Sequence, residues 1–275
     1  MYTLYYPPHP ALADFVEVIC IMGHDFNAGN FLSPVYTFMP THTRFLCFYL
    51  EDSVKVKKKN LSDFEDHGRS IIIGPQVTPV TLDLGRKNVN LLVILKPCGL
   101  YRLLGIPLSE MVDCDFDATL VIGPEINSLT EQLMESPTSQ ERNHIVQTYL
   151  LQKVAQIKPI LSIDLAMKNL VNAQGKISMD KLAAQCCLSN RQLERQSLQR
   201  IGFPPKYFAR LIRFSEAYKF KERNPQITWT EIAYHFGYYD QMHLIRDFHH
   251  FTGVNPSIVN EKEIIHSVRF NSVVL

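Results

Sequence analysis

The sequence predicts an α+β protein of two domains. Its first half carries short apolar segments separated by turn residues, which is typical of an antiparallel β-barrel or sandwich. Amphipathic helical patterns follow, and the last third of the chain contains one pattern of residues twice. At 275 residues the chain is long enough for two cores. We expect an N-terminal antiparallel β-barrel domain with helices over residues 1–157 and an all-α domain over residues 158–275.

The N-terminal half divides into extended segments and short helices. Residues 1–10 hold several tyrosines and prolines and should be extended, and residues 11–22 permit a short helix that runs into a strand. Further strands are expected over residues 44–50, 70–73, 79–84 and 88–95. Helices are expected over residues 99–104, 107–111, 125–134 and 139–156, and residues 158–171 form either a linker helix or the first helix of the second domain.

Alternation along two of these strands predicts a set of inward side chains. The set is Phe45, Cys47, Tyr49, Val89, Leu91, Val93 and Leu95, or the neighbours of opposite parity. Either set would line an apolar cavity or fill the barrel completely. The sequence does not separate these two alternatives.

The repeated pattern in the last third indicates a repeated structural unit. Leu182-Ala183 corresponds to Ile232-Ala233 at an offset of 50 residues. At an offset of 51, Ser189, Leu193, Arg195, Gly202 and Pro205 correspond to Asp240, Leu244, Arg246, Gly253 and Pro256. Each copy reads as a short helix, a tight break, a helix-starting polar residue and a second helix. This pattern predicts two helix-turn-helix units, over about residues 177–201 and 228–252.

The second helix of each unit has a polar face whose side chains are suited to reading bases. Ser189 and Asp240 are favourable N-caps, and Leu193 and Leu244 mark the inward faces. The outward side chains are Asn190, Arg191, Glu194 and Arg195 in the first unit and Gln241, Met242, Ile245 and Arg246 in the second. Arg pairs with guanine, Asn and Gln with adenine, and apolar groups contact thymine methyls. Both helices therefore fit a major groove of double-stranded DNA.

A long helix should connect the two units. Pro204-Pro205 pre-sets its first turn, and apolar residues at helical spacing continue to about Glu222. Such a helix would hold the two reading helices about 34 Å apart, which is one turn of DNA. Lys206 and Arg210 lie on a flank where they would face phosphates.

Two tracts carry a resemblance to a known family. LSNRQLERQSLQRIGFPPKYFARLIRFSEAYKF and WTEIAYHFGYYDQMHLIRDFHHFTGVNPS resemble the DNA-binding domain of the AraC/XylS family of bacterial transcription regulators. The resemblance implies that the two recognition helices enter successive major grooves and that RNA polymerase is a partner. Three departures are Ser197 in place of an aromatic residue, Asp247 after Arg246, and His249-His250 in place of a basic pair.

A weaker resemblance covers the N-terminal half. GPQVTPVTLDLG and LKPCGLYRLLGIPLSEM look like an uncharacterised subtype of the small cupin-like β-barrel sensor domains that precede the DNA-binding module in this family. By that analogy a role in sensing a small-molecule effector is favoured over a purely structural or dimerising role. Pairing of two copies through the helices between residues 125 and 156 is a further hypothesis.

Charge and motif content narrow the class of function. The net charge of +1 hides an asymmetry, because residues 176–256 hold 12 Lys and Arg against 7 Asp and Glu. No stretch predicts a membrane span or a secretion signal, so we expect a cytoplasmic protein that contacts no membrane. The six cysteines are scattered and should be reduced. The histidines, including His42, show no metal-ligand spacing, and no catalytic motif appears.

These observations predict a sequence-specific transcription regulator that is not an enzyme and needs no cofactor. A small-molecule effector or homodimerisation through the N-terminal domain would control its binding to DNA. The alternative is a sensor or protein-interaction module that keeps the fold without binding DNA.

Overall fold

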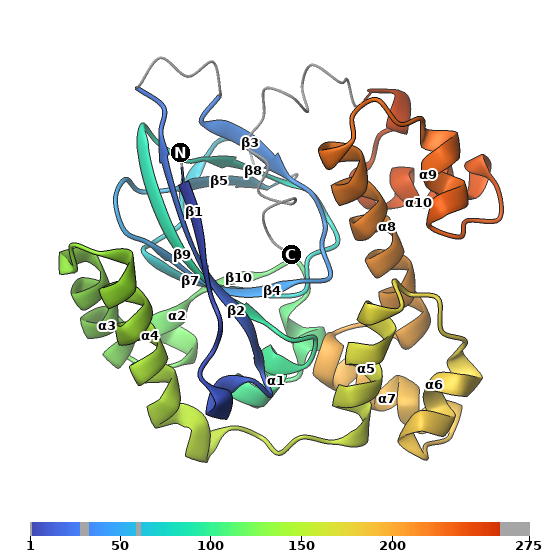
Figure 1. The fold of residues 1–275 in the computed structure, drawn as a ribbon, viewed down its shortest axis with the longest axis horizontal. Helices are drawn as coiled ribbons and strands as arrows, with labels where there is room; N and C mark the ends of the chain where they lie inside the picture. The colour runs from blue at the N-terminus through green and yellow to red at the C-terminus, as the bar shows by residue number, and fades with distance from the viewer. Residues whose placement is uncertain (1, 28–32, 59–61, 259–275) are drawn as a thin grey trace.

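The computed structural model describes residues 2–27, 33–58 and 62–258. It confirms the α+β class: two antiparallel sheets make up most of the N-terminal half, and the C-terminal half is helical (Figure 1). No helix within the described ranges is both long enough and apolar enough to cross a membrane.

The larger sheet has six strands in the order β1-β2-β9-β4-β7-β10. Their bounds are β1 Tyr2–Tyr6, β2 Val16–Asp25, β9 Lys87–Leu95, β4 Arg44–Tyr49, β7 Ser70–Ile73 and β10 Asp115–Asp117. The smaller sheet has the order β3-β8-β5-β6, with β3 Val35–Phe38, β8 Val80–Asp83, β5 Lys55–Lys58 and β6 Glu65–Asp66. The two sheets lie face to face, and an apolar cluster that includes Tyr36, Phe38, Phe45, Cys47 and Leu92 joins them.

The register of β4 and β9 corrects the expected set of inward residues. Phe45 pairs with Ile94, Cys47 with Leu92 and Tyr49 with Asn90. Directly opposed residues in an antiparallel pair share a face, so odd positions of β4 lie beside even positions of β9. The expectation that Val89, Leu91, Val93 and Leu95 face the same way as Phe45, Cys47 and Tyr49 was therefore wrong. Those four residues instead belong to the core on the other face of the sheet.

Helices cover that other face of the larger sheet. They are η1 Pro10–Leu12, α1 Gly99–Leu104, η2 Leu108–Met111, α2 Ala118–Val121, α3 Glu125–Glu135, α4 Ser139–Lys153 and η3 Val154–Gln156. Ile126 and Leu133 of α3 are fully buried in one cluster with Leu46, Phe48 and Leu91 of the sheet. Figure 1 shows α3 and α4 as an antiparallel pair at the edge of the molecule farthest from the helical half.

The helical half is built around the long helix α8. Its elements are α5 Ser162–Asn172, α6 Met179–Cys186, α7 Asn190–Ile201, α8 Pro205–Arg223, α9 Trp229–His235, α10 Gln241–Thr252 and η4 Pro256–Ile258. At about 1.5 Å per residue, the 19 residues of α8 span roughly 28 Å. Figure 1 shows α5, α6 and α7 at one end of α8 and α9 and α10 at the other.

The two halves pack closely against each other. Gly202, which ends α7 with a φ of 93°, lies so close to Pro75 and Leu108 that a Cβ would meet them at 2.7 and 2.9 Å. The hydroxyls of Thr41 and Ser215 are hydrogen-bonded at 3.2 Å. Arg44 is buried at the same junction, with its guanidinium 6.0 Å from the ring centre of Phe203. The end of α7 and one side of α8 are thereby held against the N-terminal half.

Candidate DNA-binding surface and ligand cavity

The first helix-turn-helix unit is formed by α6 and α7. Cys187 ends α6 in the left-handed conformation with a φ of 54°. Ser189 caps α7, since its hydroxyl accepts from the Gln192 amide while the Gln192 side chain accepts from the Ser189 amide. Leu193 is buried, as expected. The four expected reading residues, Asn190, Arg191, Glu194 and Arg195, are all exposed on the first half of α7.

The second half of α7 is anchored rather than exposed. Arg200 is buried and forms a two-point ion pair with Asp164 of α5, with both N–O distances 2.7 Å. Its guanidinium also stacks 4.7 Å from the ring centre of Tyr101 in the N-terminal half. Ser197 is fully buried, and its hydroxyl donates to the Phe203 carbonyl at 2.6 Å. Ser197 stands where the AraC/XylS family commonly has an aromatic residue, and its buried hydroxyl still has a hydrogen-bond partner.

The second unit is formed by α9 and α10 and repeats this geometry. Gly237 makes the turn with a φ of 70°, and the Asp240 carboxylate accepts from the His243 amide at 2.6 Å. Leu244 and Phe248 are buried as expected. Of the four expected reading residues, Gln241, Met242 and Arg246 are exposed and Ile245 is half-buried.

The two expected phosphate contacts differ in their surroundings. Lys206, near the start of α8, is exposed. Arg210, one turn further on, is half-buried and donates to the Asp247 carboxylate of α10 at 2.8 and 3.1 Å. Asp247 is buried, so the unusual acidic residue after Arg246 points inward and fastens α10 to α8. This geometry favours a structural role for Arg210.

The histidine pair at the end of α10 stays at the surface. His249 and His250 are both exposed, and the His250 ring is 3.2 Å from the hydroxyl of Tyr207.

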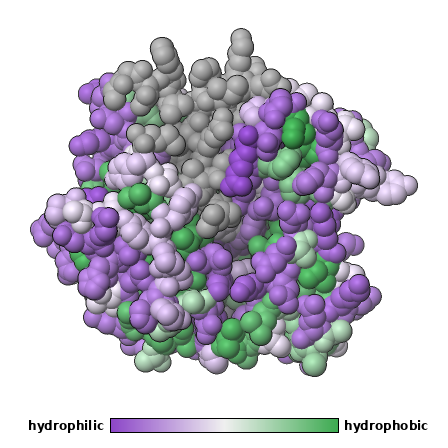
Figure 2. Space-filling view, in the orientation of Figure 1, coloured by the Kyte–Doolittle hydropathy of each residue, from purple (hydrophilic) through white to green (hydrophobic). Residues whose placement is uncertain are grey.

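On the face shown in Figure 2, the helical half is largely hydrophilic, with apolar side chains in scattered patches. The exposed surface of the two units therefore has the polar character that contact with a phosphate backbone requires.

Two different family models match the N-terminal and the C-terminal halves of the chain. Residues 182–262 match the model of a family described as a helix-turn-helix domain. The C-terminal part of this chain is a helix-turn-helix domain of the AraC type. Residues 4–117 match a second family, described as a domain of unknown function, DUF6597. The AraC-type domain makes the chain a DNA-binding transcription regulator.

Solved structures of similar architecture cover nearly the whole chain. The apo form of a variant of ToxT from Vibrio cholerae is 13% identical, with a TM-score of 0.47, and the match covers 90% of this chain and 97% of that one. Wild-type ToxT from the same organism, bound to an unsaturated fatty acid, is also 13% identical, with a TM-score of 0.43 and coverages of 86% and 94%. No curated protein matches the sequence.

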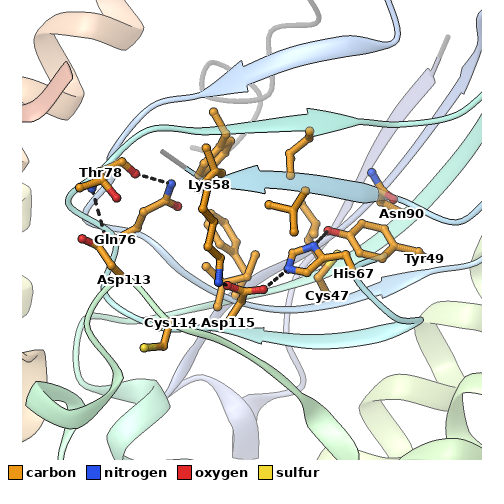
Figure 3. A pocket seen from close by; sticks show the side chains of 18 of the residues that line it. Cys47, Tyr49, Lys58, His67, Gln76, Thr78, Asn90, Asp113, Cys114 and Asp115 are labelled. Carbon is orange, nitrogen blue, oxygen red and sulfur yellow. Dashed lines mark hydrogen bonds and ion pairs between the residues drawn. The ribbon is translucent and has the colours of Figure 1, made fainter. Parts of the chain in front are cut away.

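A cavity of about 80 Å³ lies between the two sheets of the N-terminal half (Figure 3). Its walls are mostly apolar and come from β3, β4, β5, β7, β8 and β9. Of the expected inward set, Phe45, Cys47 and Tyr49 line it, together with Leu92 and Asn90 of the other parity. The sequence did not indicate several of its polar members, which include Lys58, His67, Gln76, Asp113 and Asp115.

One connected group at the side of the cavity consists of Tyr49, His67, Asp115 and Lys58 (Figure 3). Asp115 forms an ion pair with Lys58 and lies 2.6 Å from His67 Nε2, and the other ring nitrogen of His67 is 3.4 Å from the Tyr49 hydroxyl. Burial would raise the pKa of the Asp115 carboxyl, but hydrogen bonds from His67 and Lys58 outweigh it and lower that pKa to about 2. Burial raises the pKa of the Cys47 thiol to about 12, so this thiol is protonated and unreactive.

One wall of the cavity is also part of the contact with the AraC-type domain. Gly74 and Gln76 line the cavity, while Pro75, between them, touches Gly202 at the end of α7. Val77 packs against the core of the helical half. The Asp113 carboxylate fixes this segment by accepting from the Val77 and Thr78 amides at 2.7 and 3.0 Å. Among the described residues, no cluster of three or more potential metal ligands occurs.

Proposed function

We propose that this regulator reads a specific sequence of double-stranded DNA through both helix-turn-helix units. The proposed base-reading residues are Asn190, Arg191, Glu194 and Arg195 of α7 and Gln241, Met242, Ile245 and Arg246 of α10. Lys206 is proposed to contact phosphate, and Arg210 to support this surface from its pair with Asp247. Arg195 and Arg246 occupy corresponding positions of the two units and are the proposed guanine readers.

One observation carries this proposal: the N-terminal halves of both second helices expose their polar faces at opposite ends of one rigid helix. The end of α7 packs against the N-terminal half through Arg200 and Gly202, but the proposed reading residues precede them and are exposed. The roughly 28 Å length of α8 is comparable to the distance of about 34 Å between successive major grooves on one side of DNA.

Selection of bound sites from random DNA, followed by gel-shift titration over a salt series, tests the proposal. A protein that reads DNA through both units should enrich one sequence with two conserved blocks about one helical turn apart. Its affinity should fall steeply with salt. Enrichment of no sequence, or of a single block, would contradict reading by both units and would favour the alternative of a protein-interaction module.

We also propose that occupancy of the cavity controls DNA binding. The segment from Gly74 to Thr78 supports this, because it lines the cavity on one side and touches the end of α7 on the other. An effector shifts the affinity for DNA only if it binds one arrangement of this segment better than another. The coupling would therefore pass through a few residues that contact both the cavity and the first unit.

Two aspartates that do not contact each other allow a test of regulation by the cavity. One provides the test variant and the other the matched control variant. Asp113→Ala removes the acceptor for the Val77 and Thr78 amides, and it should change the affinity for DNA about 5-fold or more. Asp52→Ala removes the same kind of clamp, on the Arg86 and Lys87 amides, at a turn away from α7. It should leave the affinity for DNA unchanged. Equal effects of the two variants would contradict the proposed coupling.

We also propose a domain boundary and, as an alternative form of control, a pairing of two copies. The chain divides after residue 157 into a sensor domain and a DNA-binding domain over residues 158–275, of which residues 259–275 lie outside the described part. Pairing of two copies through α3 and α4 is the alternative form of control. Sedimentation at micromolar concentration tests it, since a monomer under conditions that support specific DNA binding would contradict control by pairing.

A further inference from the structure

The cavity between the sheets contains one buried acceptor without a partner. Asn90 is 2% exposed and lines the cavity, and its side-chain oxygen Oδ1 has no hydrogen-bond donor among the described residues. A buried acceptor left unpaired costs stability, so its partner is expected to be a bound group. We propose that the cavity binds an uncharged, mainly apolar molecule that donates one hydrogen bond to Asn90 Oδ1. This inference rests on the proposed function only in treating the cavity as a ligand site.

The remaining polar side chains beside Asn90 use their donors on one another. The Tyr49 hydroxyl can donate to His67 Nδ1, and His67 Nε2 then donates to the Asp115 carboxylate, which also pairs with Lys58. In this assignment, the hydrogens of Tyr49 and His67 both point along the series toward Asp115. Tyr49 is the cross-strand partner of Asn90, yet its hydrogen is already used. The Asn90 oxygen is therefore the group that still requires a donor.

The charges that line the cavity argue against a charged ligand. Lys58 and Asp115 neutralise each other, and Asp113, whose carboxylate is fixed by two backbone amides, lies at the opposite end from Asn90 (Figure 3). A carboxylate or ammonium placed beside Asn90 would lose its hydration without gaining a free counter-charge. A hydroxyl or amide loses less on burial and regains a hydrogen bond.

The size and the walls of the cavity define the rest of the molecule. Its apolar walls include Phe45, Val56, Ile73, Leu82 and Leu92. Since one water-sized group needs roughly 10–15 Å³, a volume of about 80 Å³ accommodates roughly five to eight such groups in contact with these walls. The expected ligand is thus a short aliphatic or small aromatic molecule that carries a single donor, such as a hydroxyl.

Four probes of nearly equal size test separately whether a hydrogen-bond donor, a charge or an apolar shape determines binding to the cavity. They are hexan-1-ol, 1-methoxypentane, hexanoate and hexylammonium, each titrated into the full-length protein with binding followed by ligand-observed NMR. The alcohol should bind most tightly, about 5-fold or more better than the ether, which accepts hydrogen bonds but donates none. The two ions should bind more weakly than the alcohol. Equal binding of the ether, or tighter binding of either ion, would overturn the proposal, and so would binding of no probe.

Two variants of Asn90 assign the effect to this residue. Asn90→Leu keeps the approximate volume but removes the acceptor, so the preference for the alcohol over the ether should disappear. Asn88→Leu is the control, because Asn88 lies on the same face of β9 but outside the cavity, and this preference should persist. Asn90→Asp places a carboxylate at the same position, and the preference should move toward hexylammonium. The Asn90→Asp variant is expected to gain affinity for hexylammonium. This test therefore remains decisive even if Asn90→Leu loses stability.

The outcome separates the ligand chemistry from the proposed function. If the alcohol binds through Asn90 but leaves the affinity for DNA unchanged, the ligand class stands and control by the cavity fails. If Asp113→Ala changes DNA binding while hexanoate is the preferred probe, control stands and the ligand class is wrong.

Discussion

The two helix-turn-helix units share one geometry but differ in how they are held. In the first unit, the end of α7 is fixed by Arg200, which pairs with Asp164 and stacks on Tyr101, and by the close approach of Gly202 to Pro75. The second unit is held mainly by α8, through the pair of Arg210 and Asp247 and through buried aromatic rings. The first unit is therefore in contact with the N-terminal half, whereas the second is held by α8.

This difference indicates where a signal from the N-terminal half would enter. A rearrangement of the segment from Gly74 to Thr78 would act directly on the end of α7. Helix α10 packs on α8 and α9, so the rearrangement would reach it through these helices. In the first unit the buried Arg200 fastens α7, and in the second the half-buried Arg210 of α8 fastens α10. Arg195 and Arg246 are exposed and are the proposed readers of DNA.

The largest effect is expected for the buried arginine of the first unit. Arg200→Ala leaves the Asp164 carboxylate buried without its partner, which costs about 3–5 kcal/mol of folding free energy. Chemical denaturation measures this loss. Arg195→Ala, on the exposed face of the same helix, is the control and should change the unfolding free energy by less than about 0.5 kcal/mol. Similar losses in both variants would mean that α7 does not divide into a holding half and a reading half.

The exposed arginines should affect DNA recognition instead. Arg195→Ala and Arg246→Ala are each expected to cost about 1–3 kcal/mol of binding and to relax the base preference at a single position of the selected site. The two positions should lie in different blocks, because the two arginines belong to units at opposite ends of α8. Competition gel shifts with every base at each position measure this. A uniform loss on all sequences would show that these arginines contact phosphate.

The junction between the halves should weaken in acid. Burial, together with the neighbouring charges of Lys219 and Arg44, holds the pKa of His42 well below its ordinary value of 6.5, although Glu216 lies 3.8 Å from Nδ1. The folded protein therefore keeps His42 neutral at a pH where the unfolded chain binds a proton. The free energy of unfolding is therefore expected to fall as the pH drops below 6.5, the ordinary pKa of histidine.

His42→Gln removes this titration and isolates it from other groups. The unfolding free energy of the wild type should fall between pH 7.5 and pH 5.5 by about 1 kcal/mol more than that of the variant. His24, whose pKa burial lowers to about 4, contributes equally to both proteins and cancels in the comparison. Parallel pH profiles for the two proteins would exclude His42 as the sensitive group at this junction.

The helical half was predictable because its signals are local. The repeated caps, the turn at Gly237, the inward leucines and the proline start of α8 all lie within a few residues of the structure they specify. The structure confirms each of these. What the sequence did not reveal is how Arg210 and Asp247 pair, since these residues come from different helices and both look like ordinary surface charges.

The cavity was less predictable because its walls depend on pairing between distant strands. Strand β5, Lys55–Lys58, is rich in lysine, which is uncommon in strands, and it was not predicted, nor were β3, β6, β10 and α2. Alternation identified the two faces of β4 and β9 correctly but not their relative register, and this register decides that Asn90 lies beside Tyr49. His67 directly follows β6 of the smaller sheet and Asp115 lies in β10 of the larger one, so their contact depends on how the two sheets are arranged.

The smallest effect should distinguish the two cations at the start of α8. Lys206→Ala is expected to weaken binding to all DNA sequences alike and to reduce the slope of log K against log salt concentration by about 0.9, the value for one phosphate contact. Arg210→Ala should leave this slope unchanged, because its guanidinium is paired with Asp247, and should lower the unfolding free energy instead. Gel shifts at four or more salt concentrations, with denaturation of each variant, measure both quantities. A reduced slope for Arg210→Ala would place this residue among the groups that contact DNA and would remove the distinction between its role and that of Lys206.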